Sequence, residues 1–277
     1  MYNSLIMLNN LKDIFYRPKL KFLRLTSYLL YFRKFPKSTK WNNWSEIDSN
    51  FGLLSSDLYF DKFRRSKLVI ETMDYQNLDA KKYSKTLKLV GIIEPKIGSP
   101  IKPFVLRNSL NAGHQYRHLV EYTNCTNINV NSYKRIVEFG GGYGCMRWLI
   151  SQQRFEGQYE IVENPGITML QEKYLRLSLS PSHFEHTNWN QTIKDLIPNL
   201  KSEDLFIGLW SVSETPTEIM LEILESLEKA ECHLLLAFQH NFNGRNNSSY
   251  FNKYFGYAIR KEIAYPADNS HSTYIFQ

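Results

Sequence analysis

The segment RIVEFGGGYGCMRWL, residues 135–149, decides the fold class of this chain. It opens with an apolar run typical of a buried strand, continues with four glycines within five positions, and ends in a stretch with helical spacing. Glycine allows a sharp turn and lets backbone N–H groups approach a ligand without an intervening Cβ atom. A glycine-rich turn between a strand and a helix is therefore typical of a nucleotide-binding site.

The spacing of the glycines indicates which ligand the loop would bind. Glu138, Gly140, Gly142 and Gly144 form E-x-G-x-G-x-G, whereas a dinucleotide-binding G-x-G-x-x-G would need a glycine at Cys145. No Lys-Ser or Lys-Thr pair follows, which excludes a phosphate-binding P-loop. Glycines at every second position suit a ligand without phosphates whose amino-acid tail lies along the loop, which describes S-adenosylmethionine. An NAD(P)-dependent oxidoreductase is the alternative.

A carboxylate at the end of the next predicted strand supports a nucleoside ligand. Glu163 closes the apolar run of residues 158–163, nineteen positions after Gly144. A carboxylate in this place can accept hydrogen bonds from both ribose hydroxyls. The alternative is a solvated carboxylate at a strand end, and the glycine loop at the appropriate separation favours ribose binding.

The chain divides into two regions at the proline- and glycine-rich residues 91–104. We expect residues 1–104 to be mostly helical, on the acceptor or lid side, and residues 105–277 to form the cofactor-binding domain. From residue 105 onward, short apolar runs alternate with helical stretches, which predicts a mostly parallel sheet with helices on both faces and an antiparallel last strand. The expected strands are residues 135–139, 158–163, 183–188, 204–210, 232–238, 257–266 and 271–277.

Four stretches of the second region resemble a known family: VEFGGGYG (137–144), YEIVENPG (159–166), QEKYL (171–175) and LWSVSETP (209–216). They are similar to the sugar O-methyltransferases, which belong to the class I methyltransferases dependent on S-adenosylmethionine. The resemblance covers about residues 108–277. It implies a Rossmann-like sheet and transfer of a methyl group to a sugar hydroxyl in a surface glycan or its nucleotide- or lipid-linked precursor. A non-catalytic scaffold with the same fold is a further alternative.

The resemblance also implies roles for individual residues. Gly140, Gly142 and Gly144 would face the methionine part of the cofactor, and Glu138 would orient its amino group. Glu163 would hold the ribose. Asn188 would lie near the adenine, after the third strand, and Trp210 and Ser211 would lie beside the transferring methyl group.

A base is needed because a sugar hydroxyl is barely ionised at neutral pH. Ligands of such sheets bind beyond the carboxyl ends of the parallel strands. Glu214 follows the predicted fourth strand, His240 follows the fifth, and His271 begins the last strand, which would start at the same edge if it is antiparallel. His240 is the first candidate for the base, and Glu214 and His271 come next.

The other paired histidines favour a structural interpretation. His114 and His118 lie four positions apart on one helical face, and we favour a helix cap or a surface pair over a metal pair because no third ligand is near. His183 and His186 receive the same interpretation, and no metal is required. The predicted helix that carries His114 and Arg117 precedes the first strand, so either residue could still contact the cofactor or the acceptor.

Composition indicates the cellular setting. The chain has 277 residues, a net charge of +7 and three widely spaced cysteines without a CxxC pair, which favours a reducing cytoplasm. The apolar run at residues 25–32 is too short to span a bilayer, which needs about 20 residues. We favour a solvated basic helix in the first 40 residues over one lying on the inner face of the membrane. No motif indicates nucleic acid, and no feature indicates an oligomeric state.

Overall fold

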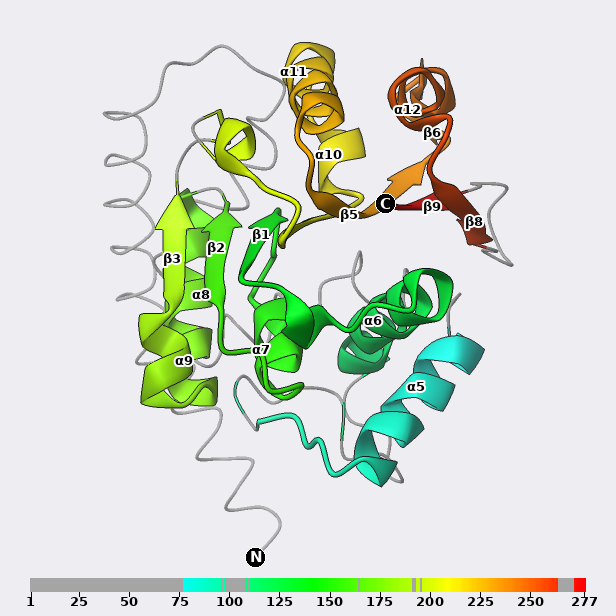
Figure 1. Ribbon diagram of the computed structural model, residues 1–277. Helices are drawn as coiled ribbons and strands as arrows, with labels where there is room; N and C mark the ends of the chain where they lie inside the picture. Colours follow the sequence, from blue (N-terminus) through cyan, green and yellow to red (C-terminus); the bar gives the residue numbers. More distant parts are fainter. Residues whose placement is uncertain are drawn as a thin grey trace, which may run out of the picture.

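A seven-stranded sheet forms the centre of the computed structural model (Figure 1), which describes residues 77–95, 97, 108, 110–163, 165–190, 193–194, 196–263 and 272–277. In spatial order the strands are β3 (Thr187–Asn190), β2 (Gln158–Val162), β1 (Arg135–Phe139), β4 (Asp204–Leu209), β5 (His233–Gln239), β9 (Ser272–Phe276) and β8 (Ile259–Ile263).

The pairing confirms the predicted mostly parallel sheet with an antiparallel last strand. β1, β2, β3, β4 and β5 pair in parallel, while β9 is antiparallel to both β5 and β8. β9 is therefore inserted between β5 and β8, and β8 forms the edge. From β1 the chain runs outward through β2 and β3 and then returns to place β4 on the other side of β1. Such a reversal leaves a crevice at the carboxyl ends of β1 and β4, where ligands of α/β sheets bind.

Both faces of the sheet are buried, which explains the nearly continuous apolar runs of its central strands. Ile136 and Val137 are adjacent in β1 and fully buried, and they belong to two separate hydrophobic clusters. Side chains alternate across a strand, so these clusters lie on opposite faces. The helices that cover the two faces bury their apolar sides into these clusters.

Helices from separate parts of the chain cover the two faces (Figure 1). The first face carries α5 (Asn77–Leu89), α6 (Leu110–Thr126), α7 (Cys145–Ser151), α8 (Pro165–Ser178) and α9 (Pro181–Glu185). The second face carries α10 (Ser211–Glu214), α11 (Thr217–Lys229) and α12 (Asn247–Phe255). The smaller elements are the 3-10 turns Val130–Ser132 and Ile197–Asn199 and the hairpin of β6 (Asn241–Phe242) and β7 (Arg245–Asn246).

One predicted strand differs from the structure, and one helix of the structure had no prediction. The predicted strand at residues 183–188 is wrong: the chain forms α9 first, and β3 begins only at Thr187. The Ser180 side chain caps α9 and Pro181 occupies its first turn, a start signal that outweighs the weak alternation of the segment. Helix α12 was not predicted. It is capped by the side chain of Asn246, which accepts a hydrogen bond from the N–H of Ser249.

The proposed boundary near residue 104 stays a prediction. Helix α5 lies before this boundary, yet Leu87 is buried in the same cluster as the first face of the sheet. Asn108 donates to the carbonyl of Ile92 at 2.9 Å and accepts from the N–H of Glu94 at 2.6 Å, so Asn108 is tied to the residues that follow α5. The basic segment of the first 40 residues lies outside the described residues. Within the described part, none of the helices has the length and apolar character needed to cross a membrane.

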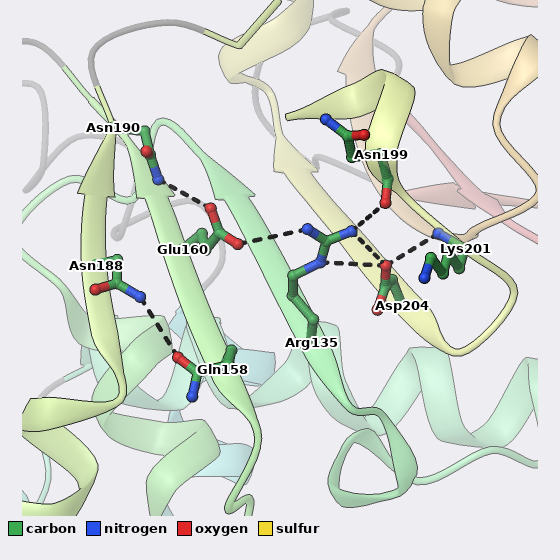
Figure 2. A network of polar contacts seen from close by, with 8 residues as sticks. All are labelled: Arg135, Gln158, Glu160, Asn188, Asn190, Asn199, Lys201 and Asp204. Carbon is green, nitrogen blue, oxygen red and sulfur yellow. Dashed lines mark hydrogen bonds and ion pairs between the residues drawn. The ribbon is translucent and has the colours of Figure 1, made fainter. Parts of the chain in front are cut away.

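An ion-pair network ties β1, β2 and β4 together on the second face (Figure 2). Arg135 donates to Asp204 at 2.6 Å and to the carbonyl of Asn199 at 2.5 Å, and its Nη1 lies 3.6 Å from Glu160. Asp204 also accepts from the N–H of Lys201, and its side chain is only 5% exposed. Because this carboxylate is nearly buried, it depends on the guanidinium for compensation.

We expect Arg135→Met to lower the free energy of unfolding by about 2–3 kcal/mol, because it leaves the Asp204 carboxylate buried without its cation. The measurement is the urea unfolding midpoint. The control is Lys134→Met, which removes the exposed neighbouring pair of Lys134 with Glu203, and we expect no resolvable change. Equal effects of the two variants would contradict a specific contribution of the network.

Candidate functional site

The glycine loop between β1 and α7 is fixed by contacts with two neighbouring strands. The N–H of Gly140 donates to the carbonyl of Val162 at the end of β2, at 2.9 Å. Gly140 has a φ of +76°, and a Cβ atom there would lie 2.3 Å from Cβ of Ser211, which follows β4. Only glycine fits this position, because both the backbone conformation and the close approach exclude a side chain. The loop is thereby held at the crevice between β1 and β4.

Glu163 meets the glycine loop. Its Oε2 accepts a hydrogen bond from the N–H of Gly142 at 2.9 Å. Glu163 follows β2, and Gly142 belongs to the loop after β1. The structure therefore brings together the two features that the sequence analysis singled out first, the glycine spacing and the carboxylate nineteen residues beyond Gly144.

Glu138 lies directly beneath the loop, on the first face of the sheet. The Tyr159 hydroxyl donates to its Oε2 at 2.8 Å. A Cβ atom on Gly141 would lie 2.8 Å from this oxygen and 2.8 Å from Nε2 of Gln171 in α8. Burial raises the pKa of Glu138 to about 7, with a further increase from Glu163, while the Tyr159 hydrogen bond and Arg147 act in the opposite direction. The carboxyl group is thus held near its midpoint at neutral pH.

Arg147 is a buried cation that the sequence analysis did not identify. It lies in α7, donates to Oγ1 of Thr187 at 2.9 Å and to the carbonyl of His183 at 2.6 Å, and lies over the ring of Tyr159. Burial lowers its pKa to about 10, and Tyr159 and Glu138 oppose this decrease. The Arg147 side chain remains protonated at neutral pH and stabilises the ionised form of Glu138. All seven residues of α7 are buried, so no alternation of polar and apolar positions in the sequence singled out Arg147.

Gln171 carries an unused donor next to Glu138. Its Oε1 accepts from the indole N–H of Trp189 at 3.1 Å. Its Nε2 is buried and has no hydrogen-bond partner among the described residues. A buried donor without a partner is rare and requires an explanation such as a ligand. Together with the Glu138 carboxylate, it offers both a donor and an acceptor beneath Gly141.

The end of β4 forms the opposite wall of the crevice. Trp210 has a φ of +61°, a strained value for a residue with a side chain, and its N–H donates to the carbonyl of Ala237 at 2.7 Å. Its indole N–H donates to Ser272 on β9 at 3.3 Å. The Ser211 hydroxyl donates to the carbonyl of Phe139. Trp210 and Ser211 therefore adjoin the glycine loop, on the side predicted for the acceptor.

The interpretation of His114 and His118 as a helix cap or surface pair is wrong. His118 is fully buried and His114 is partly buried, and the two rings contact each other with their Nε2 atoms 3.3 Å apart. His114 stacks on Trp210, with ring centroids 5.6 Å apart and planes inclined by 24°. Within the described part of the chain, no third His, Cys, Asp or Glu joins them in an arrangement that could hold a metal.

The predicted catalytic residues have separate partners. Glu214 accepts from Gln239 at 2.7 Å, and burial raises its pKa although this hydrogen bond lowers it. His240 has its Nε2 atom 2.7 Å from the hydroxyl of Thr273 on β9. Both residues follow parallel strands at the carboxyl edge, as expected. His271 lies outside the described residues.

The predicted position of Asn188 is wrong. It lies within β3 and pairs in register with Glu160, three residues before Glu163. Its side chain is exposed and donates to Gln158 at 3.4 Å, near the amino end of β2 (Figure 2). The error follows from the strand boundary, because a strand that ended at residue 188 would have placed Asn188 at the carboxyl edge.

Comparisons with known proteins find similarity at the level of solved structures. No protein-family model and no curated protein sequence matches the chain. The methyltransferase domain of bacterial CtHen1 aligns at 11% identity and a TM-score of 0.46, over 59% of this chain and 97% of that chain. The precorrin-6y C5,15-methyltransferase of Geobacter metallireducens aligns at 10% identity and a TM-score of 0.44, over 64% of this chain and 93% of that chain. The structure of PigF with SAH aligns at 14% identity and a TM-score of 0.40, over 61% of this chain and 59% of that chain.

The topology itself defines the fold. The order β3-β2-β1-β4-β5-β9-β8, the single antiparallel strand β9 and the glycine loop after β1 are those of a Rossmann-like class I methyltransferase sheet. The similarity to the three solved structures is a similarity of the backbone fold and does not indicate the substrate of this chain.

We expect Gly140→Ala to destabilise the fold, because the new methyl group collides with Ser211 at a positive φ. Gly244→Ala is the matched control: Gly244 has a φ of +78° with nothing within 4 Å of the added Cβ, so it isolates the backbone effect. Thermal unfolding should show the larger loss for Gly140→Ala and partial recovery in Gly140→Ala/Ser211→Gly. A Gly140→Ala protein as stable as Gly244→Ala would contradict the collision.

We expect Glu138→Gln to gain stability relative to the wild type as the pH rises. The pKa of Glu138 is raised to about 7 in the folded chain, so above its unfolded value of 4.5 ionisation increasingly opposes folding, and this effect is complete above pH 7. Between pH 5 and pH 8 the difference should grow by about 2–3 kcal/mol. Urea unfolding at several pH values measures it, with Glu172→Gln on the exposed side of α8 as control. A difference independent of pH would contradict the raised pKa.

Proposed function

We propose that this chain is an S-adenosylmethionine-dependent O-methyltransferase that acts on a sugar hydroxyl in glycan biosynthesis. The observation that carries the proposal is the convergence of Gly142, Glu163, Glu138 and Gln171 at the carboxyl ends of β1 and β2. This set offers a ribose-binding carboxylate together with a donor and an acceptor for an amino-acid tail. None of these four residues carries a positive charge that would bind a pyrophosphate.

The residues present fit the cofactor. The Nε2 donor of Gln171, which has no partner among the described residues, would meet the carboxylate of the methionine part. Glu138 would accept from its ammonium group, which favours the ionised form of this carboxyl. Glu163 would exchange its bond to the Gly142 N–H for bonds to the ribose hydroxyls. When bound, S-adenosylmethionine supplies a methyl group on a sulfonium, which is already a strong electrophile.

The remaining residues would align the acceptor and exclude water. Trp210 and Ser211 adjoin the glycine loop through the contact of Ser211 with Gly140. Glu214 and His240 lie at the edge where the acceptor would enter, next to the ends of β4 and β5. The choice of a sugar acceptor rests on the resemblance of residues 137–144, 159–166, 171–175 and 209–216 to the sugar O-methyltransferases. We propose a cytoplasmic location from the cysteine pattern, because the three cysteines are widely spaced and form no CxxC pair.

Calorimetric titration tests the cofactor. We expect S-adenosylhomocysteine to bind and NAD⁺ and NADP⁺ not to bind. Binding of a dinucleotide alone would overturn the proposal in favour of an oxidoreductase. Binding of S-adenosylhomocysteine without methyl transfer to any of a broad panel of glycosides would instead support a non-catalytic scaffold.

We expect Glu163→Ala to weaken S-adenosylhomocysteine binding by tenfold or more, because it removes charge-assisted hydrogen bonds worth about 1.5–3 kcal/mol each. Glu163→Gln keeps one acceptor oxygen and should give a smaller loss. The control Glu172→Ala removes a carboxylate from the exposed pair with Arg176 on α8 and should leave the affinity unchanged. Unchanged affinity in Glu163→Ala would refute the ribose assignment.

A further inference from the structure

One face of helix α6 forms a wall of the crevice. Asn111, His114 and His118 are spaced by three and four residues, so they lie on the same side of the helix. Asn111 donates to the hydroxyl of Tyr143 in the glycine loop at 2.6 Å. His114 stacks on Trp210 at the end of β4. This face therefore contacts both the cofactor loop and the side where the acceptor would lie.

A chain of ring contacts extends from His114 into the core. Nε2 of His114 lies 3.3 Å from Nε2 of His118, and Nδ1 of His118 lies 2.5 Å from the hydroxyl of Tyr274 on β9. His118 also contacts Trp210 edge to face, with ring centroids 5.2 Å apart. Two imidazoles and a phenol are thus held in series, with their orientations fixed by packing.

Nδ1 of His114 is the outermost nitrogen in this series of rings. Nδ1 of His114 is buried, and no described residue hydrogen-bonds to it. If Tyr274 accepts from Nδ1–H of His118, then His118 Nε2 accepts from Nε2–H of His114, and the lone pair of His114 Nδ1 is free. The opposite polarity would place a proton on His114 Nδ1 and make it a donor. The donor–acceptor direction of these two hydrogen bonds therefore decides whether Nδ1 of His114 can act as a base.

Electrostatics keep both imidazoles neutral. Burial lowers the pKa of His114 to about 3, with a smaller contribution from the guanidinium of Arg117. The pKa of His118 is also well below its usual value, mainly from burial and then from His114 and Arg117. The charged and titratable groups around His114 are thus His118, Arg117 and, through His118, Tyr274. A neutral imidazole has a lone pair available at physiological pH.

We propose that His114 is the general base of the methyl transfer and accepts the proton of the acceptor hydroxyl at Nδ1, while His118 and Tyr274 are positioning residues that select the required tautomer. This inference rests on the proposed function.

The step is balanced by a single proton transfer. The acceptor oxygen forms a bond to the methyl carbon, the carbon–sulfur bond breaks with its electron pair remaining on sulfur, and the hydroxyl proton moves to Nδ1 of His114. The acceptor oxygen becomes strongly acidic only as the new bond forms, so a weakly basic imidazole suffices at that stage. The extra proton can be shared between the two imidazoles through Nε2 of His114 and Nε2 of His118 before it returns to water.

His114 is better placed for this role than the candidates suggested by the sequence. Nε2 of His240 is already 2.7 Å from Thr273, and the carboxylate of Glu214 accepts from Gln239. His114, by contrast, stacks on Trp210, whose neighbour Ser211 contacts Gly140. His240 and Glu214 would then contact the acceptor at the edge rather than take its proton.

Nitrogen NMR of protein labelled with ¹⁵N-histidine tests the tautomer without any acceptor. We expect Nδ1 of His114 to be unprotonated and its ring to stay neutral from pH 8 down to pH 5, with and without S-adenosylhomocysteine. The signals are assigned with His114→Gln. Tyr274→Phe removes only the hydroxyl and should change the tautomer balance of His118 and His114. A protonated Nδ1 at pH 7, or a His114 that titrates near its usual pKa of 6.5, would overturn the proposal.

Turnover provides the second arm, measured as transfer of a labelled methyl group to a panel of methyl glycosides. We expect His114→Ala to lower kcat by about 100-fold or more with unchanged affinity for S-adenosylhomocysteine, and added imidazole to restore part of the activity. His114→Gln serves if the alanine variant fails to fold. His186→Ala, an exposed histidine after α9, is the matched control and should retain activity.

Different results would refute the proposed function and the assignment of His114 as the base. Loss of S-adenosylhomocysteine binding by the wild type would refute the proposed function, whereas the tautomer of His114 is readable in the free protein. Full activity of His114→Ala, or a stronger kcat loss in His240→Ala than in His114→Ala, would refute the base assignment and leave the methyltransferase proposal intact.

Discussion

The close approach of Gly140 to Ser211 is the constraint on which the site depends. It exists because β1 and β4 are neighbours at the point where the strand order reverses, so the loop after β1 must pass against the turn after β4. The hydrogen bond from Ser211 to the carbonyl of Phe139 closes the same junction. A larger residue at position 140 would separate the two strand ends. With the junction closed, Glu163 accepts from the N–H of Gly142 in the loop, and Trp210 stacks on His114 of α6.

Beneath the loop, a buried polar group determines the electrostatics. Glu138 is held by Tyr159 and lies near Arg147, yet burial dominates and its pKa is raised to about 7. A site in this state responds to a cationic ligand, since a positive charge nearby would restore the ionised carboxylate. The Gln171 donor next to it adds the complementary group. This combination suits an amino-acid tail, which carries both charges, better than a phosphate.

Helix α6 connects the glycine loop with helix α5. Its inner face contacts Tyr143, Trp210 and Tyr274. Helix α5 packs against α6, where the Tyr83 hydroxyl donates to Glu121 and Leu87 is buried. The histidines of α6 are consequently placed by packing on both of their sides.

The sequence by itself determined the features that depend on neighbouring residues. Apolar runs predicted most strands of the sheet, and the spacing of Gly140, Gly142 and Gly144 predicted the tight turn after β1, because periodicity and backbone freedom are local properties. The start of α9 at Pro181 also has a local signal, the Ser180 cap followed by proline. Tertiary structure alone decided the contact of His118 with Tyr274, 156 residues away, and the burial of Arg147 and Gln171. Such contacts depend on which faces pack together, and a histidine on a helix looks the same in sequence whether it faces water or a tryptophan.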